Sequence, residues 1–192
     1  MAPRGHPRWV HSEPDSQRLP GHQPADLPAG VGIRPGGCGP MSEILWDVER
    51  LTEATRQSVP MAAQTRVEVV EAERGRVVLR MPLEGNGNHI GTMYAGALFA
   101  LCEFPGGTLF STTFDALRYY PIVKGVDISF RKFAGTDITV EASMSEEEAA
   151  RIAAAADEHG KADYDLVMEL KDTDGNVVAI STNRYQMRSH GI

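Results

Sequence analysis

Hydrophobic positions recur along the chain with two different spacings, which separate predicted helices from predicted strands. Residues 43–57 carry apolar side chains at helical spacing, so we expect a helix there, with Ser42 as its cap and Pro60 closing the region. Six other segments alternate apolar and polar residues, as strands with one buried face do. These predicted strands are residues 65–72, 76–81, 122–133, 136–144, 162–171 and 176–187.

Turn and capping residues mark the connections between these segments. Residues 74–75 (Arg-Gly) and 172–175 (Asp-Thr-Asp-Gly) each predict a hairpin turn between neighbouring strands. Ser145 and Glu148 stand at capping-box spacing, and Gly160 suits a C-terminal cap. A short helix is therefore expected between Ser145 and Gly160.

A further helix is predicted for residues 93–110, whose apolar side chains cover every side. We expect this helix to be buried all round. Glu103 is its only charge, and Pro105 followed by two glycines should kink or end it.

These elements predict an α+β fold in which an antiparallel six-stranded sheet is wrapped around one central helix. The apolar helix would lie across the concave face of the sheet, and residues 41–192 would form a single domain. Because an open sheet keeps unpaired edges, we expect dimerisation by edge pairing.

Residues 1–40 differ in composition from the rest of the chain. They hold 8 of the 12 prolines and 7 of the 19 glycines, so we expect this segment to be disordered. It lacks the apolar region of a secretory signal and the basic character of a transit peptide. We interpret it as a non-functional extension ahead of a natural start at Met41, the alternative being a functional tail.

Charge and cysteine content exclude several classes of function. The net charge of −7 is unsuited to binding the phosphate backbone of nucleic acid. Two cysteines cannot build a disulfide framework or a tetrahedral cysteine zinc site, so we expect a cytoplasmic protein without a metal. No stretch of about 20 uninterrupted apolar residues is present, so no membrane association is expected.

Glu103 is the first candidate for chemistry, because a charge inside an apolar helix is costly unless it has a partner or a purpose. One interpretation is a structural glutamate bonded to a backbone group or an arginine. The other is a general base in a cleft, with a pKa raised by burial. The polar loop 84–92 leads into the start of the helix, whose free N–H groups can stabilise an oxyanion. Together these parts suit hydrolysis of an activated acyl group.

The segment 88–103 (NHIGTMYAGALFALCE) resembles the helix-start motif of PaaI-like hotdog-fold thioesterases. The pattern of that family is Asn, two residues, Gly, two residues, His-Gly-Gly, six residues, then Asp or Glu. Asn88, Gly91 and Glu103 match the pattern. Tyr94 stands where the family usually has histidine.

Ala95 and Gly96 stand where the family has two glycines, so the first glycine is replaced and the second is kept. A closer likeness is to YiiD-like uncharacterised hotdog proteins, whose helix opens Gly-Thr-Met-Phe/Tyr-Ala/Gly-Gly. The resemblance covers residues 43–188 and includes the short helix at 145–159. It implies a hotdog fold with clefts at the interface of a homodimer or homotetramer.

The resemblance implies an acyl-CoA thioesterase that needs no cofactor beyond the coenzyme A of its substrate. Glu103 would activate water or attack the thioester carbon, and the backbone N–H of Ala95 would bind the thioester oxygen. Asn88 would help to hold the water. Tyr94 in place of histidine would weaken substrate positioning. The residues expected to contact the substrate are His89, Gly91, Thr92, Gly96, Arg131 and Lys132.

Several alternatives remain open at this point. Arg131 and Lys132 either contact the phosphates of coenzyme A or form an ordinary solvated strand end. His89 and Glu103 are 14 positions apart, as in 3-hydroxyacyl thioester dehydratases, but the proline-rich loop of those enzymes is missing. A non-catalytic acyl-CoA or fatty-acyl binding protein is another alternative, and the thioester could be carried by an acyl carrier protein. We expect Cys102 to be a buried, inert thiol.

Overall fold

The computed structural model describes residues 47–190. The predictions for residues 1–40, for a start at Met41 and for a cap at Ser42 lie outside the described residues. Six antiparallel strands form one sheet in the order β1-β2-β4-β5-β6-β3. The strands are β1 (Glu68–Glu73), β2 (Arg76–Met81), β3 (Tyr119–Phe130), β4 (Ile138–Ser143), β5 (Lys161–Lys171) and β6 (Val177–Ser189).

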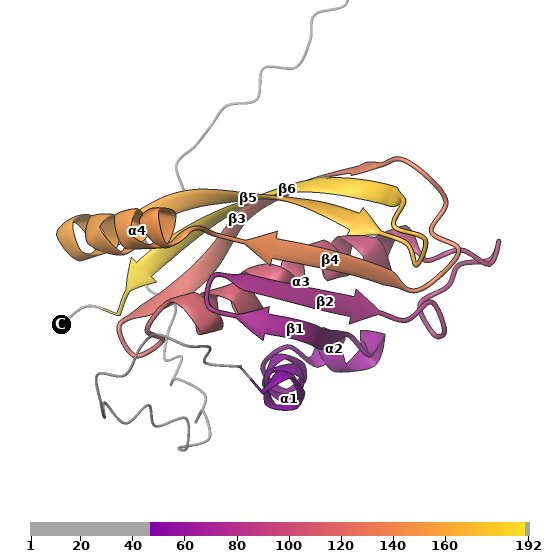
Figure 1. The fold of residues 1–192 in the computed structure, drawn as a ribbon, viewed down its shortest axis with the longest axis horizontal. Helices are drawn as coiled ribbons and strands as arrows, with labels where there is room; N and C mark the ends of the chain where they lie inside the picture. Colours follow the sequence, from indigo (N-terminus) through magenta and orange to yellow (C-terminus); the bar gives the residue numbers. More distant parts are fainter. Residues whose placement is uncertain (1–46, 191–192) are drawn as a thin grey trace, which may run out of the picture. The chain divides into compact units, whose positions relative to one another are not determined.

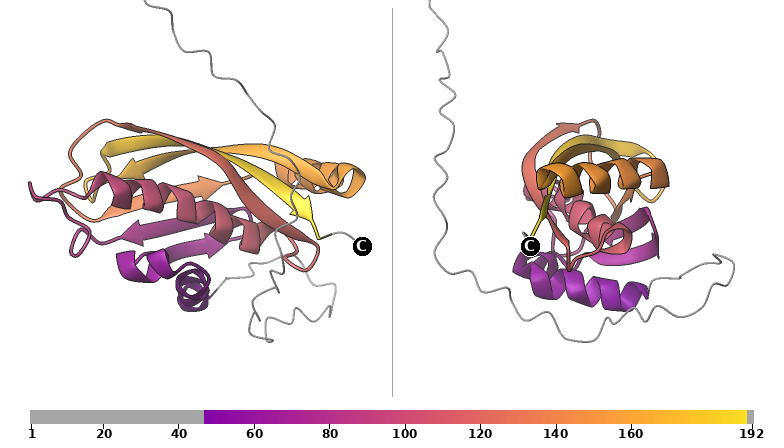
Figure 2. Two further views of the ribbon diagram at one scale, coloured as in Figure 1. Left: turned by 180° about the vertical axis from the view of Figure 1, so that it is seen from behind. Right: turned by 90° about the vertical axis from the view of Figure 1, so that its left-hand side faces the viewer.

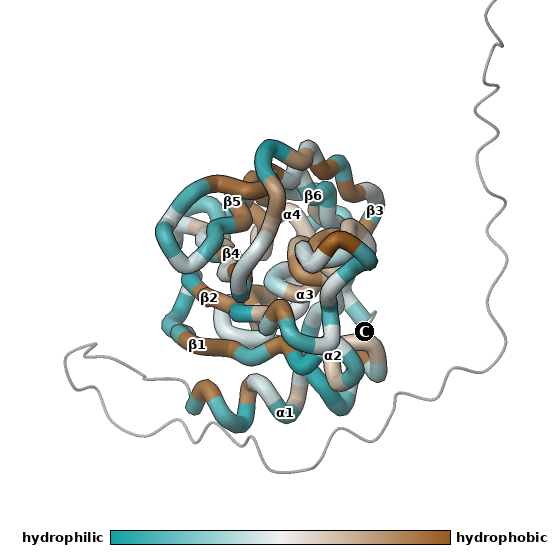
Figure 3. The backbone as a smooth tube through the Cα atoms, turned by 90° about the vertical axis from the view of Figure 1, so that its right-hand side faces the viewer, coloured by the Kyte–Doolittle hydropathy of each residue, from teal (hydrophilic) through white to brown (hydrophobic). Residues whose placement is uncertain are grey.

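The sheet curves around one long helix, α3 (Ala95–Thr113), as Figure 1 shows. Seen end-on in Figure 3, the strands form an arc with α3 inside it. The predicted α+β fold, an antiparallel six-stranded sheet wrapped around a central helix, is confirmed. The alternating sequence of β5 explains this packing, because every second side chain from Ala162 to Leu170 is buried and the intervening ones are exposed.

Both predicted hairpin turns are present. The turn between β1 and β2 uses Gly75 at φ 76°, and the turn between β5 and β6 uses Gly175 at φ 80°. A residue with a Cβ adopts this left-handed region only at a cost, which explains glycine at both positions. The helix α4 (Glu146–His159) also begins and ends as predicted: the Ser145 hydroxyl accepts a hydrogen bond from the Glu148 N–H at 3.1 Å, and Gly160 caps the end at φ 74°.

The first described helix, α1 (Val48–Ser58), starts later than predicted and is capped by the Asp47 carboxylate. The first helix ends at Ser58, just before Pro60, as predicted, but the helix that follows was not predicted. A second helix, α2 (Pro60–Thr65), begins at this proline. Proline suits the first position of a helix, because the N–H that it lacks would have no partner there.

Helix α3 differs from its prediction in two ways. The helix does not end at Pro105. It continues through the two following glycines and ends at Thr113. The helix is also not buried all round. One stripe, formed by Ala95, Phe99, Gly107 and Ser111, is exposed, and Phe99 keeps 45% of its surface. The reason is that the sheet covers only one side of α3, as the left view of Figure 2 shows.

Candidate active site

The start of α3 presents two neighbouring backbone donors. The Tyr94 N–H donates to the Asn86 carbonyl at 2.8 Å, and the N–H groups of Ala97 and Leu98 donate to the Tyr94 carbonyl at 2.9 and 3.1 Å. Between them, the N–H groups of Ala95 and Gly96 have no acceptor within residues 47–190. Because Tyr94 supplies no side-chain cap, the positive end of the helix is available to a ligand oxygen.

The loop before α3 is held by two asparagines. Buried Asn86 donates its amide to the carbonyls of Thr65 and Pro82 at 2.8 and 2.9 Å. The Asn88 Oδ1 accepts from the N–H groups of Ile90 and Thr92, and its Nδ2 donates to the Thr92 hydroxyl at 2.9 Å. The side chain of Asn88, predicted to hold water, therefore makes bonds within its own loop. Asn86 was not singled out from the sequence, because nothing there distinguishes it from other loop asparagines.

Tyr94 lies beside the free donors. Its side chain keeps 60% of its surface exposed, and a Cβ on Gly96 would come within 2.4 Å of its ring. Glycine at 96 therefore gives the Tyr94 ring room to fold back over the start of the helix. A cavity of about 380 Å³ opens here, lined by Tyr94, by Gly96, Ala97 and Ala100 of α3, by loop residues 85–87 and by residues of α2.

Glu103 lies two turns further along α3, on the same side as Ala95 and Phe99. It is half-buried, and within residues 47–190 no donor bonds to its carboxylate. Burial raises the pKa of Glu103 above its ordinary value. Among the described residues, the structure therefore gives no support to a glutamate paired with an arginine or a backbone group. A carboxylate with a raised pKa and free oxygens is suited to accept a proton near neutral pH.

The neighbouring Cys102 is buried, and burial raises the pKa of its thiol to about 11. Its Sγ donates to the Phe99 carbonyl at 3.0 Å. A thiol with this pKa is almost entirely protonated at neutral pH and is a poor nucleophile. The expectation of an inert thiol agrees with this environment.

The other predicted substrate contacts lie around the same end of α3. His89 and Gly91 are exposed in the loop, and Thr92 is half-buried. The Met93 N–H donates to the Ala134 carbonyl at 2.8 Å, which ties the helix start to the segment after β3. Arg131 and Lys132 belong to that segment and are exposed, with the Lys132 ammonium 3.2 Å from the Asn176 amide oxygen.

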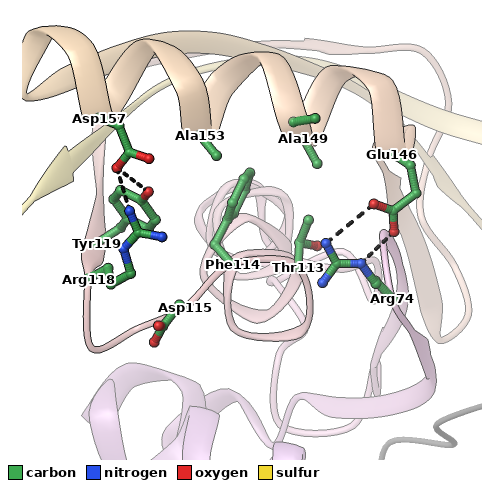
Figure 4. A pocket seen from close by; sticks show the side chains of 11 residues that line it. Arg74, Thr113, Phe114, Asp115, Arg118, Tyr119, Glu146, Ala149, Ala153 and Asp157 are labelled. Atoms are coloured by element: carbon green, nitrogen blue, oxygen red, sulfur yellow. Dashed lines mark hydrogen bonds and ion pairs between the residues drawn. The ribbon is translucent and has the colours of Figure 1, made fainter. Parts of the chain in front are cut away.

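A second cavity, of about 300 Å³, lies at the other end of α3, below α4. Figure 4 shows Phe114 between two sets of paired charges. Arg74 pairs with Glu146, and Asp157 accepts from both Arg118 and the Tyr119 hydroxyl. None of the predicted site residues lines this cavity.

Residues 47–190 contain no group of three or more His, Cys, Asp or Glu side chains arranged to hold a metal ion. In the same part of the chain, no helix is long and apolar enough to cross a membrane.

Comparisons with known proteins show which family and which solved structures this chain resembles. Residues 48–186 match the model of a family described as a domain of unknown function, DUF4442. A crystal structure from Pseudomonas aeruginosa, described as a protein of unknown function and probable thioesterase, is 46% identical with a TM-score of 0.71, covering 74% of this chain and 95% of its own. No curated protein sequence matches the chain.

More distant structures share the fold. A mutant thioesterase from Pseudomonas aeruginosa is 15% identical with a TM-score of 0.59, covering 75% of this chain and 95% of its own. A thioesterase from Haemophilus influenzae is 11% identical with a TM-score of 0.60, covering 75% of this chain and 92% of its own. The chain therefore belongs to the DUF4442 family and has the hotdog fold of the thioesterase superfamily.

Proposed function

We propose that the protein hydrolyses the thioester of an acyl-CoA. One observation carries this proposal: the unpaired, half-buried carboxylate of Glu103 lies on the same side of α3 as the free N–H groups of Ala95 and Gly96. Eight residues of helix separate Glu103 from Ala95 by about 12 Å along the axis. A proton acceptor and an oxyanion site thus lie on one exposed side of α3, although Glu103 does not line the cavity at the start of the helix.

In the proposed reaction, the carbonyl oxygen accepts hydrogen bonds at the start of α3, from the N–H of Ala95 above all. Glu103 takes a proton from water as the water oxygen attacks the carbonyl carbon, and the negative charge that forms on the carbonyl oxygen is stabilised by the N–H groups. The carbon–sulfur bond then breaks, and the proton held by Glu103 passes to the leaving sulfur, so that the products are the acid and the free thiol. Direct attack by the Glu103 carboxylate is the alternative, with water then hydrolysing the resulting anhydride.

We further propose that two copies of the chain enclose each cleft. The exposed stripe of α3 is apolar around Glu103, and in the described part of the chain the edge strand β3 has a neighbour, β6, on one side only. A second copy that paired along β3 would bring another α3 alongside and shield Glu103 from bulk solvent, while leaving room for the single attacking water. Exclusion of bulk water would strengthen the electrostatic interactions within the site.

Arg131 and Lys132 support coenzyme A as the carrier. They are exposed basic side chains, and the hydrogen bond from Met93 to Ala134 holds their segment beside the start of α3. In this arrangement they would contact the phosphates, with the acyl group directed towards Glu103.

The second candidate is a protein that binds acyl-CoA without hydrolysing it. The position of Tyr94 favours it, because the ring lies over Gly96 beside the free N–H groups. In that case the ring would restrict access of the thioester oxygen to these donors while leaving the rest of the cleft open.

Thiol release from short, long and aromatic acyl-CoAs distinguishes the candidates, with the full-length protein measured beside Glu103→Gln. Loss of the proton acceptor should lower kcat by about 10²–10⁴-fold. Glu158→Gln, a change at an exposed glutamate of α4, is the matched control and should leave kcat unchanged.

No release from either protein, together with thermal stabilisation by acyl-CoA, would favour the binding protein. Equal release from the parent and Glu103→Gln would exclude Glu103 as the catalytic carboxylate.

A further inference from the structure

Helix α3 is interrupted in its own bonding at the turn that carries Glu103. Pro105 has no N–H, so the Leu101 carbonyl lacks the donor that a regular helix would supply. Two glycines follow, and glycine is among the poorest helix formers. Since Glu103 lies two residues before the proline, the helix alone gives this turn less support than the rest of α3 receives.

Strand β6 supplies donors to this turn from outside the helix. The Asn183 amide donates to the Cys102 carbonyl at 2.7 Å and to the Tyr185 hydroxyl oxygen at 3.0 Å. The Tyr185 hydroxyl in turn donates to the Glu103 carbonyl at 3.2 Å. Asn183 and Tyr185 are almost fully buried, so water does not compete for these bonds.

The close approach of Tyr185 depends on Gly106. A Cβ at this position would lie 2.2 Å from the Tyr185 hydroxyl and ring. On its other side the Tyr185 ring stacks on Tyr164, with ring centroids 5.4 Å apart and an angle of 19° between the planes. Tyr185 is therefore fixed between a strand neighbour and the helix backbone.

We propose that Tyr185, supported by Asn183, is a positioning residue that fixes the Glu103 turn of α3 relative to the oxyanion donors at the start of the helix. This inference rests on the proposed function, in which Glu103 accepts a proton from water. Tyr185 does not touch the substrate. Its hydroxyl acts through the main chain of Glu103, and a displacement of about 1 Å in such a group can cost on the order of 10²-fold in rate.

The test is Tyr185→Phe, which keeps the ring and its packing and removes only the donor. We expect kcat for acyl-CoA hydrolysis to fall about 10- to 100-fold, with KM changed by less than about twofold. Tyr164→Phe is the matched control. It removes a hydroxyl from the ring stacked on Tyr185, and within residues 47–190 that hydroxyl makes no hydrogen bond to α3. Its kcat should stay within about twofold of the parent.

A second measurement does not depend on turnover. The ¹³C resonance of the Glu103 backbone carbonyl should move upfield in Tyr185→Phe, because the carbonyl loses the hydrogen bond from the Tyr185 hydroxyl, and should stay in place in Tyr164→Phe. An unmoved resonance in Tyr185→Phe would overturn the inference, as would an unchanged kcat or a change confined to KM.

If the parent protein releases no thiol at all, the proposed hydrolysis fails. The carbonyl resonance then still reports whether Tyr185 holds this turn of α3.

Discussion

The two ends of α3 carry cavities of similar size. The polar groups are unpaired near one cavity and paired with each other near the other. At the start of the helix, the N–H groups of Ala95 and Gly96 are without acceptors among the described residues, and Glu103 two turns on has no donor on its carboxylate. At the far end, Arg74 pairs with Glu146, and Asp157 accepts from Arg118 and Tyr119. The first end leaves polar groups for a ligand, whereas the second uses them within the protein.

This difference separates function from stability within one helix. Unpaired groups cost free energy in the folded protein, and they persist where binding or catalysis needs them. Paired groups at an exposed site contribute modestly to the stability of the fold. Their donors and acceptors are already used within the protein, so few remain to bind a substrate. The presence of a cavity alone does not tell these two situations apart.

The largest expected difference between the two ends is in turnover. Gly96→Ala places a methyl group where the Tyr94 ring now lies, so the ring must move beside the oxyanion donors, and we expect kcat/KM to fall about tenfold. Thermal stability should not fall, because alanine is the better helix former. Ala150→Ser adds one atom to the lining of the far cavity and should leave kcat/KM unchanged. A comparable loss in both variants would end the distinction between the two cavities.

A smaller effect is expected on stability, and here the removal of a charged side chain should stabilise the folded protein. Burial raises the pKa of Glu103, so the contribution of this group to stability is present below its unfolded pKa and is lost as the pH rises through its folded pKa. The half-buried carboxylate lowers the free energy of unfolding when it is ionised, and the neutral amide of glutamine does not. Glu103→Gln should therefore raise Tm at pH 8.

Unfolding followed by calorimetry from pH 4 to pH 8 measures this effect. The gain should shrink towards acid pH, where Glu103 is protonated. A loss of stability at pH 8 would indicate that the carboxylate has a partner in the assembled protein.

The smallest effect is expected at the far end. The hydrogen bond from Tyr119 and the charge of Arg118 lower the pKa of Asp157, so its contribution is present above the unfolded pKa and is lost as the pH falls through the folded pKa. Asp157→Asn should lower Tm at pH 7 by less than Glu103→Gln raises it at pH 8, and kcat should be unchanged. Reduced turnover in a protein that is still folded would connect this end of α3 to the reaction.

The sequence predicted those features that depend on near neighbours. The period of two located all six strands, and the turn at Gly75 and the caps at Ser145 and Gly160 were predicted from a few adjacent residues. The differences from prediction, a missed helix and a helix that runs on, came at two prolines, because the effect of a proline depends on its surroundings. Pro60 happens to occupy the first position of a helix, and Pro105 is tolerated within one.

Features of the site that depend on distant partners were less accessible. The motif from Asn88 to Glu103 drew attention to the right helix, but Asn183 and Tyr185 lie about 80 residues later and carry no local signal. Nor did the apolar composition of α3 show which stripe the sheet leaves uncovered. The one local signal is Gly106, because a glycine directly after a proline within a helix indicates that another group approaches the backbone there.

The order of the strands has a consequence for the chain as it is synthesised. Within residues 47–190, strand β3 pairs only with β6, which ends about sixty residues later, whereas the β1–β2 and β5–β6 pairs each join neighbours in sequence. At typical ribosomal rates of about 5–20 residues per second, β3 waits for several seconds without its partner. During this interval its half-apolar edge and the neighbouring α3 are surfaces that a chaperone can bind. Pairing of β6 with β3 then covers the exposed strand and lowers the tendency of the nascent chain to aggregate.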